Sequence, residues 1–70
     1  MKFVQIKDDN YVNIENISFV YLFKTVIGDI KIIYWVFKTS TSELKSDFFE
    51  TEENAKKWFD ENIAPIMFNK

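Results

Sequence analysis

The fold is decided by residues 17–38, which read ISFVYLFKTVIGDIKIIYWVFK. Successive side chains of a β-strand point to opposite faces of the sheet. The first half divides on that basis into Ile17, Phe19, Tyr21 and Phe23 on one face and Ser18, Val20, Leu22 and Lys24 on the other. The second half divides into Ile30, Ile32, Tyr34 and Val36 and into Lys31, Ile33, Trp35 and Phe37. Three of the four sets are mostly apolar, and the set Ser18, Val20, Leu22 and Lys24 is half apolar. We therefore expect a central strand pair with something covering each face.

Between the two strands, expected over 17–24 and 30–38, lies the turn signal Gly28-Asp29. Such a pair between two apolar runs is typical of an antiparallel hairpin. The residues at 25–27 leave open a loop that is longer than two residues.

The residues before this hairpin predict a smaller one. Val4 and Ile6 alternate with polar neighbours over 3–7, which indicates a short strand. Residues 8–10 read as a turn because Asp and Asn tolerate left-handed backbone angles. Tyr11 and Val12 are expected to pair back, and 13–16 to form a tight or 3₁₀ turn.

The residues after the hairpin predict a polar loop over 39–43, an edge strand over 44–50 and a helix. Phe48 and Phe49 would place one ring on each face of the sheet. Thr51 is a good N-cap for a helix whose apolar stripe is Ala55, Trp58, Phe59 and Ile63. The i,i+4 spacing predicts the ion pairs Glu52–Lys56 and Glu53–Lys57. Pro65 is expected to end the helix, and the tail at 66–70 is expected to dock on the domain.

The expected fold class is therefore α+β: an antiparallel meander of four to five strands with one C-terminal amphipathic helix packed on one sheet face, in a single small domain over residues 1–70. Trp35 and Phe37 favour their own face as the one under the helix. The opposite choice would place Ile17, Phe19, Tyr21 and Ile32 there. The expected core is Val4, Ile6, Val20, Leu22, Ile33, Trp35, Phe37, Phe49, Ala55, Trp58, Phe59 and Ile63.

The composition argues against an enzyme. The chain has no His and no Cys, which removes the usual general bases, thiolate nucleophiles and soft metal ligands. Its one glycine, Gly28, cannot build a phosphate-binding loop. The carboxylate pairs at 8–9 and 52–53 have ordinary structural explanations at a turn and at a helix start. We therefore expect no catalytic residues, no metal and no cofactor.

No apolar run reaches the ~18 residues of a membrane span, and the first residues lack the apolar stretch of a signal peptide. A cytoplasmic location without membrane contact is the expectation. Lys, Asn, Ile and Phe are abundant while Arg is absent, as AT-rich coding sequences tend to produce. This composition is a hint of a low-GC bacterium or its phage.

The function indicated by the residues is interaction with another protein chain. One helix of about eleven residues spans roughly 16 Å and covers the middle of one sheet face only. The other face would leave apolar rings exposed, which is typical of a binding surface. We expect a homodimer, or a complex with another protein, through Phe19, Tyr21, Phe23, Ile32 and Tyr34.

An alternative function is single-stranded nucleic-acid binding, in which bases stack on the aromatic side chains beside Lys24, Lys31 and Lys38. The formal net charge of −2 and the absence of Arg argue against it, because neutralising phosphates supplies much of such affinity.

Overall fold

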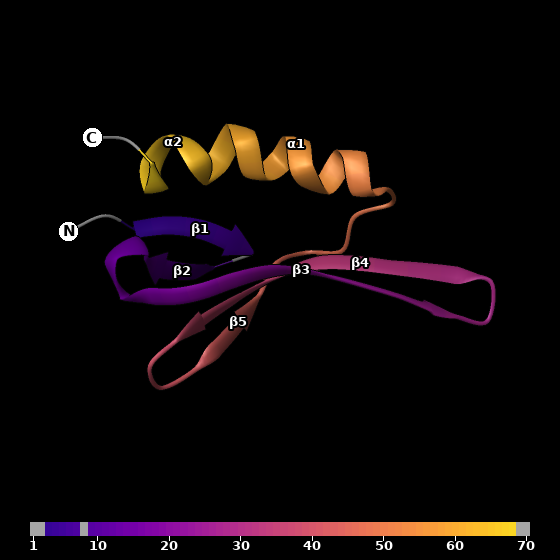
Figure 1. Cartoon of the computed structure of the whole chain (residues 1–70), viewed down its shortest axis with the longest axis horizontal. Helices are drawn as coiled ribbons and strands as arrows, with labels where there is room; N and C mark the ends of the chain where they lie inside the picture. Colours follow the sequence, from indigo (N-terminus) through magenta and orange to yellow (C-terminus); the bar gives the residue numbers. More distant parts are fainter. Residues whose placement is uncertain (1–2, 8, 69–70) are drawn as a thin grey trace.

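The computed structural model describes residues 3–7 and 9–68 and shows an α+β fold. Its elements are β1 (Phe3–Lys7), β2 (Asn10–Asn13), the 3₁₀ helix η1 (Ile14–Asn16), β3 (Ile17–Ile27), β4 (Ile30–Thr39), β5 (Glu43–Lys45), α1 (Glu52–Asn62) and α2 (Ala64–Met67). The helices form one layer and the strands lie below it (Figure 1). The predicted fold class and the C-terminal position of the helix are confirmed.

The long hairpin of β3 and β4 is the centre of the structure. Its strands have 11 and 10 residues, and Ile27 pairs with Ile30 across a two-residue turn. Gly28 has a φ of 62°, which a residue with a side chain rarely adopts. The strands therefore run to the turn itself, and 25–27 belong to β3 and not to a longer loop.

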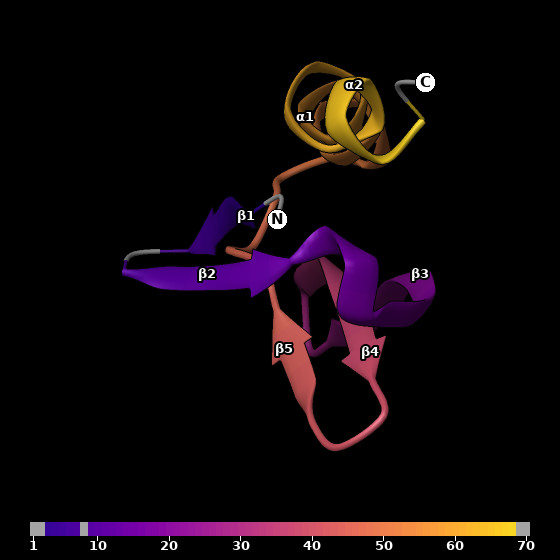
Figure 2. The ribbon, with the colours of Figure 1, turned by 90° about the vertical axis from the view of Figure 1, so that its left-hand side faces the viewer.

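The strands divide into two sheets, which differs from the predicted single meander. One sheet has the order β1-β2 and the other β3-β4-β5. The separation occurs at η1, where the Asn13 side chain accepts a hydrogen bond from the Glu15 amide at 3.0 Å. This turn redirects the chain, so β2 leads into β3 without pairing with it (Figure 2). In the predicted turn at 8–10, Asp9 has a φ of 57°, while Asp8 lies outside the described residues.

The predicted edge strand over 44–50 is shorter than expected, because β5 ends at Lys45. The chain nevertheless stays beside β4. The Ser46 amide donates to the Trp35 carbonyl oxygen at 3.0 Å, and the Phe49 amide donates to that of Ile33 at 2.8 Å. Between them the buried Ser46 hydroxyl accepts from the Trp35 amide at 2.9 Å and donates to the Asp47 carbonyl oxygen at 3.0 Å. A side chain thus takes the place of one backbone partner in the ladder.

The helix begins where the sequence predicts. The Thr51 hydroxyl accepts from the Asn54 amide at 3.0 Å, and α1 follows from Glu52. Pro65 does not end the helical region, because it lies in the first turn of α2. Backbone N–H groups in a first turn have no acceptor within the helix, so the missing N–H of proline costs no hydrogen bond there. The Glu52–Lys56 ion pair is present at 3.4 Å, whereas Glu53–Lys57 is not among the ion pairs of residues 3–7 and 9–68.

The helix covers the face of β4 that carries Trp35 and Phe37. The Trp35 indole N–H donates to the Ala55 carbonyl oxygen at 2.9 Å, and its ring lies 4.5 Å from that of Phe59 between centroids. Phe37 meets the Trp58 ring edge-on at 6.4 Å. This choice of face is the predicted one.

The expected core residues are buried or half-buried. The fully buried apolar set is Val4, Ile6, Val12, Ile33, Val36, Phe37, Ala55 and Ile63. Val12 and Val36 are additions to the predicted set. Ile66 and Met67 pack against the core as expected of a docked tail, and the tail's last two residues lie outside the described residues.

One residue lies on the opposite side from its predicted neighbours. An irregularity in the β3–β4 register between Ile17 and Phe19 breaks the strict alternation of side chains. Ile17 consequently packs against the core with Val20, while Phe19 is exposed.

Candidate interaction surface

The β3–β4 register places the five residues of the predicted surface on one face of the sheet. The directly opposite pairs are Phe19 with Lys38, Tyr21 with Val36, Phe23 with Tyr34, Thr25 with Ile32 and Ile27 with Ile30. Side chains of directly opposite residues point to the same face. Phe19, Tyr21, Phe23, Ile32 and Tyr34 thus share the face that points away from α1, which is called the open face below.

Aromatic rings form a row across this open face. The Tyr34 ring lies between those of Phe23 and Phe48, at centroid distances of 5.0 and 5.4 Å. Phe19 and Tyr21 form a neighbouring pair at 5.5 Å. These distances lie in the range where rings attract each other beyond simple burial. The row joins β3, β4 and the segment after β5 into one apolar surface.

Phe48 belongs to this surface although it was absent from the predicted set. It was expected to point away from Phe49, and it does: the Phe49 ring packs 5.6 Å from Trp58 under the helix. The doublet of adjacent rings was the signal that could have identified Phe48.

The open face is extensively exposed. Five residues of this face expose more than a third of their accessible area: Phe19 56%, Phe23 37%, Ile27 63%, Ile30 67% and Phe48 68%. With about 150–200 Å² for each fully exposed side chain, these five alone expose roughly 500 Å². The largest apolar patch of a typical monomer is about 300–600 Å². The half-buried Tyr21, Ile32 and Tyr34 add to this area.

The surface of the whole chain is also larger than its mass predicts. A folded monomer of 8.4 kDa is expected to expose about 4,600 Å². This chain exposes 5156 Å². Part of the difference follows from the long hairpin, whose turn end extends past the helices (Figure 1).

The lysines predicted beside the aromatic residues lie on two different faces. Lys38 is on the open face, 5.9 Å from the centre of the Tyr21 ring, and Lys45 lies 5.8 Å from that of Tyr34. Lys24 and Lys31 pair with Ile33 and Val26, on the helix side. Of the three lysines named for the alternative function, only Lys38 therefore lies on the open face.

The helix side of the hairpin carries a small charged cluster. Lys24 and Lys56 both lie 3.4 Å from a carboxylate oxygen of Glu52. Hydrogen bonds from Lys24 and then Lys56, together with their positive charges, lower the pKa of Glu52 below its ordinary value of 4.5. This cluster fastens the start of α1 to β3 and is exposed to solvent.

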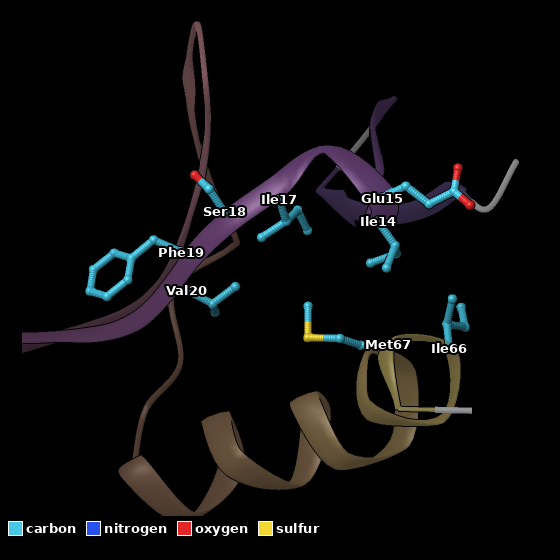
Figure 3. Close-up of a pocket in the computed structure, with 8 residues that line it drawn as sticks. All are labelled: Ile14, Glu15, Ile17, Ser18, Phe19, Val20, Ile66 and Met67. Atoms are coloured by element: carbon cyan, nitrogen blue, oxygen red, sulfur yellow. The ribbon is translucent and has the colours of Figure 1, made fainter. Parts of the chain in front are cut away.

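A groove of about 460 Å³ opens where η1 and the start of β3 face α2. Ile14, Ile17 and Val20 point across it toward Ile66 and Met67 (Figure 3). Glu15 extends away at its margin, as Figure 3 also shows. The side chains that face each other across the groove are apolar, and those of Ser18 and Glu15 point away from it (Figure 3).

The described part of the chain contains no cluster of three or more Asp, Glu, His or Cys side chains that could hold a metal ion. No helix within residues 3–7 and 9–68 has the length and apolar character needed to cross a membrane. The chain matches no protein-family model, no curated protein sequence and no solved structure.

Proposed function

We propose that this protein is a non-catalytic module that forms a homodimer through its open face. The observation that carries the proposal is the contiguous ring row on the side of the sheet that the helix does not cover, in which the half-buried Tyr34 lies between the exposed Phe23 and Phe48. Removing such rings from water is the main source of association free energy in protein interfaces.

The area of this face suits a second copy of the chain. A standard interface buries about 800 Å² on each partner. Roughly 500 Å² come from the five most exposed residues. The half-buried Tyr21, Ile32 and Tyr34 bring the total to at most about 700 Å², which lies within the standard range of about 600–1,000 Å² for each partner. The face is also broad and apolar, as sheets that pack on each other about 10 Å apart require.

The charges at the two ends of the hairpin favour an antiparallel arrangement of the two copies. Asp29 lies in the turn, and Lys38 lies at the far end of β4. A two-fold axis near Phe23 and Tyr34 would bring Asp29 of each copy close to Lys38 of the other. The dimer would then place opposite charges at both margins of an apolar centre.

Single-stranded nucleic-acid binding is the alternative. Lys38 and Lys45 do lie over rings of the open face, as that function would need. However, Lys38 is also 3.6 Å from a Glu43 oxygen, and the formal net charge of the chain is −2. Both features weaken attraction to phosphates.

The test is the molar mass in solution by light scattering across a concentration series, with and without a short oligo-thymidine. The expected result is an assembly larger than one chain that the oligonucleotide does not change. Phe48→Glu should lower the mass by breaking the face contact. Phe68→Glu is the matched control, because Phe68 is equally exposed, at 68%, but lies at the end of α2.

A wild-type monomer at all concentrations would contradict the proposal. A mass increase that requires the oligonucleotide would favour the alternative function instead.

A further inference from the structure

The outer edge of β3 is bare. In the sheet order β3-β4-β5, β3 pairs with β4 on one side and with no strand of the described residues on the other. The strand has 11 residues, so this edge is roughly 34 Å long. Figure 2 shows β3 and β5 on opposite sides of β4.

The backbone polar groups on this edge can be assigned from the hydrogen bonds on the other side of β4. The Ile33 and Trp35 carbonyls accept hydrogen bonds from Phe49 and Ser46, so odd-numbered residues of β4 face β5. Their even-numbered neighbours must face β3, where Tyr34 is directly opposite Phe23. Phe23 thus bonds to β4, and Leu22 and Lys24 present their N–H and C=O groups to the bare edge.

Apart from the irregularity between Ile17 and Phe19, this edge lacks the features that protect strand edges from pairing. Proteins usually shorten an edge strand, insert Pro or place charges on it. β3 contains no Pro and one charged residue, Lys24, whose ammonium is paired with Glu52 at 3.4 Å. The opposite edge differs, because β5 has three residues, two of them charged.

We propose that β3 pairs antiparallel with β3 of a second copy, which forms a continuous six-stranded sheet. This contact goes beyond the open-face dimer and uses a different surface. A second β3 is the fitting occupant because the strand is complementary to itself. Leu22 is the midpoint of Ile17–Ile27, and it is also a residue whose polar groups face outward.

Pairing about Leu22 gives favourable neighbours. Tyr21 of each copy faces Phe23 of the other on the open face, and such aromatic cross-strand pairs stabilise sheets. Lys24 faces Val20 of the second copy. The two Lys24 side chains then lie more than a Debye length apart. A two-fold axis at Lys24 itself would place the two like charges directly opposite each other.

The paired strands are related by a two-fold axis perpendicular to the sheet. Both helix layers consequently lie on one side, and both open faces lie on the other. If the proposed face contact also forms, two such sheets pack with their rings inside, and the complete assembly contains four chains with closed symmetry.

Amide hydrogen exchange tests the edge without any substitution. In a free edge strand the amides of Tyr21, Phe23 and Thr25 are slow, while those of Val20, Leu22 and Lys24 exchange freely. Edge pairing should slow both sets. Together with the proposed face contact, it should give four times the chain mass of 8.4 kDa in light scattering. Lys24→Pro removes an outward donor and should halve that mass.

Lys31→Pro is the matched control. Lys31 is also an exposed lysine on the helix side of the hairpin, but its amide points toward the opposite edge of β4. This variant should leave the mass and the uniform slow exchange unchanged. Circular dichroism of both variants checks that the fold persists.

The two proposals fail in different ways. A wild-type dimer that Phe48→Glu dissociates, with fast Leu22 and Lys24 amides, overturns edge pairing and supports the face contact. A dimer with slow Leu22 and Lys24 amides that Phe48→Glu leaves intact supports edge pairing and overturns the face contact. A monomer overturns both.

Discussion

The indole N–H of Trp35 donates a hydrogen bond to the carbonyl oxygen of Ala55, 2.9 Å away. This contact joins the middle of β4 to the first half of α1, and it fixes which sheet face the helix covers. Trp35→Phe keeps most of the ring packing but removes the donor. We expect the free energy of unfolding to fall by about 1–2 kcal/mol, from the lost hydrogen bond and the smaller ring. Urea denaturation measures the change, and an unaltered midpoint would contradict the role assigned to this bond.

Ser46 is expected to be more sensitive than a serine usually is. Its buried hydroxyl is the acceptor for the Trp35 amide at 2.9 Å. Ser46→Ala would leave that amide without a partner, which costs about 1–3 kcal/mol. Ser40→Ala, at an exposed position of the loop 40–42 between β4 and β5, should change stability by less than about 0.5 kcal/mol. Equal effects of the two substitutions in thermal unfolding would argue against the Ser46 hydroxyl as the partner of the Trp35 amide.

Gly28→Ala isolates the conformational requirement of the hairpin turn. A Cβ at this position would meet no atom within 4 Å, so steric contact with the rest of the protein does not contribute. The φ of 62° is unfavourable for alanine by about 1–2 kcal/mol. We expect a stability loss of that size in chemical denaturation, with the fold retained. Asp29→Ala, at the other turn residue, should cost clearly less, and the reverse order would be inconsistent with this turn geometry.

Glu52 should make part of the stability dependent on pH. The Lys24 and Lys56 ammonium groups hold its pKa below 4.5 in the folded state. A carboxyl group with a lowered folded pKa stabilises the protein above its unfolded pKa, and this contribution is lost as the pH falls through the folded value. Wild type should therefore exceed Glu52→Gln in stability at pH 7, and the difference should shrink by pH 3. Glu61→Gln is the control on the exposed helix surface. A stability difference between wild type and Glu52→Gln that grows toward low pH would contradict a lowered pKa of Glu52.

Tyr34→Glu tests the centre of the open face. Its ring is 5.0 Å from Phe23 and 5.4 Å from Phe48, so a charge there would sit in the middle of the proposed interface. We expect dissociation of the face contact in light scattering, while circular dichroism retains the signal of the helix. A Tyr34→Phe control should preserve the assembly, since it keeps the ring.

The parts of the fold that follow from local chemistry could be predicted from the sequence. The Gly28 turn, the Thr51 cap and the face carrying Trp35 and Phe37 all depend on the character of a few neighbouring residues. The shared face of the five surface residues followed from the same alternation. Their burial by a partner stays a prediction.

Other features depend on contacts between distant residues. β5 ends early because the Ser46 hydroxyl replaces a backbone partner of Trp35, and no local pattern reveals that bond. The irregularity after Ile17 moves that side chain into the core, and no turn-forming residue in the sequence predicts it. Val36 is on the open face and yet fully buried, at a position of the central strand that is directly opposite Tyr21 of β3 and Lys45 of β5.

The unequal edges of the three-stranded sheet set a limit on growth. A sheet with two adhesive edges can add chains without end and form fibrils, whereas this chain has one bare edge at β3 and one short, charged edge at β5. When two copies pair through β3, the unpaired edge of each copy becomes hydrogen-bonded, and neither can add a further chain there. The shortness of β5, which follows from a single buried serine, thus leaves each chain with one edge that can pair. Such a chain forms assemblies of limited size.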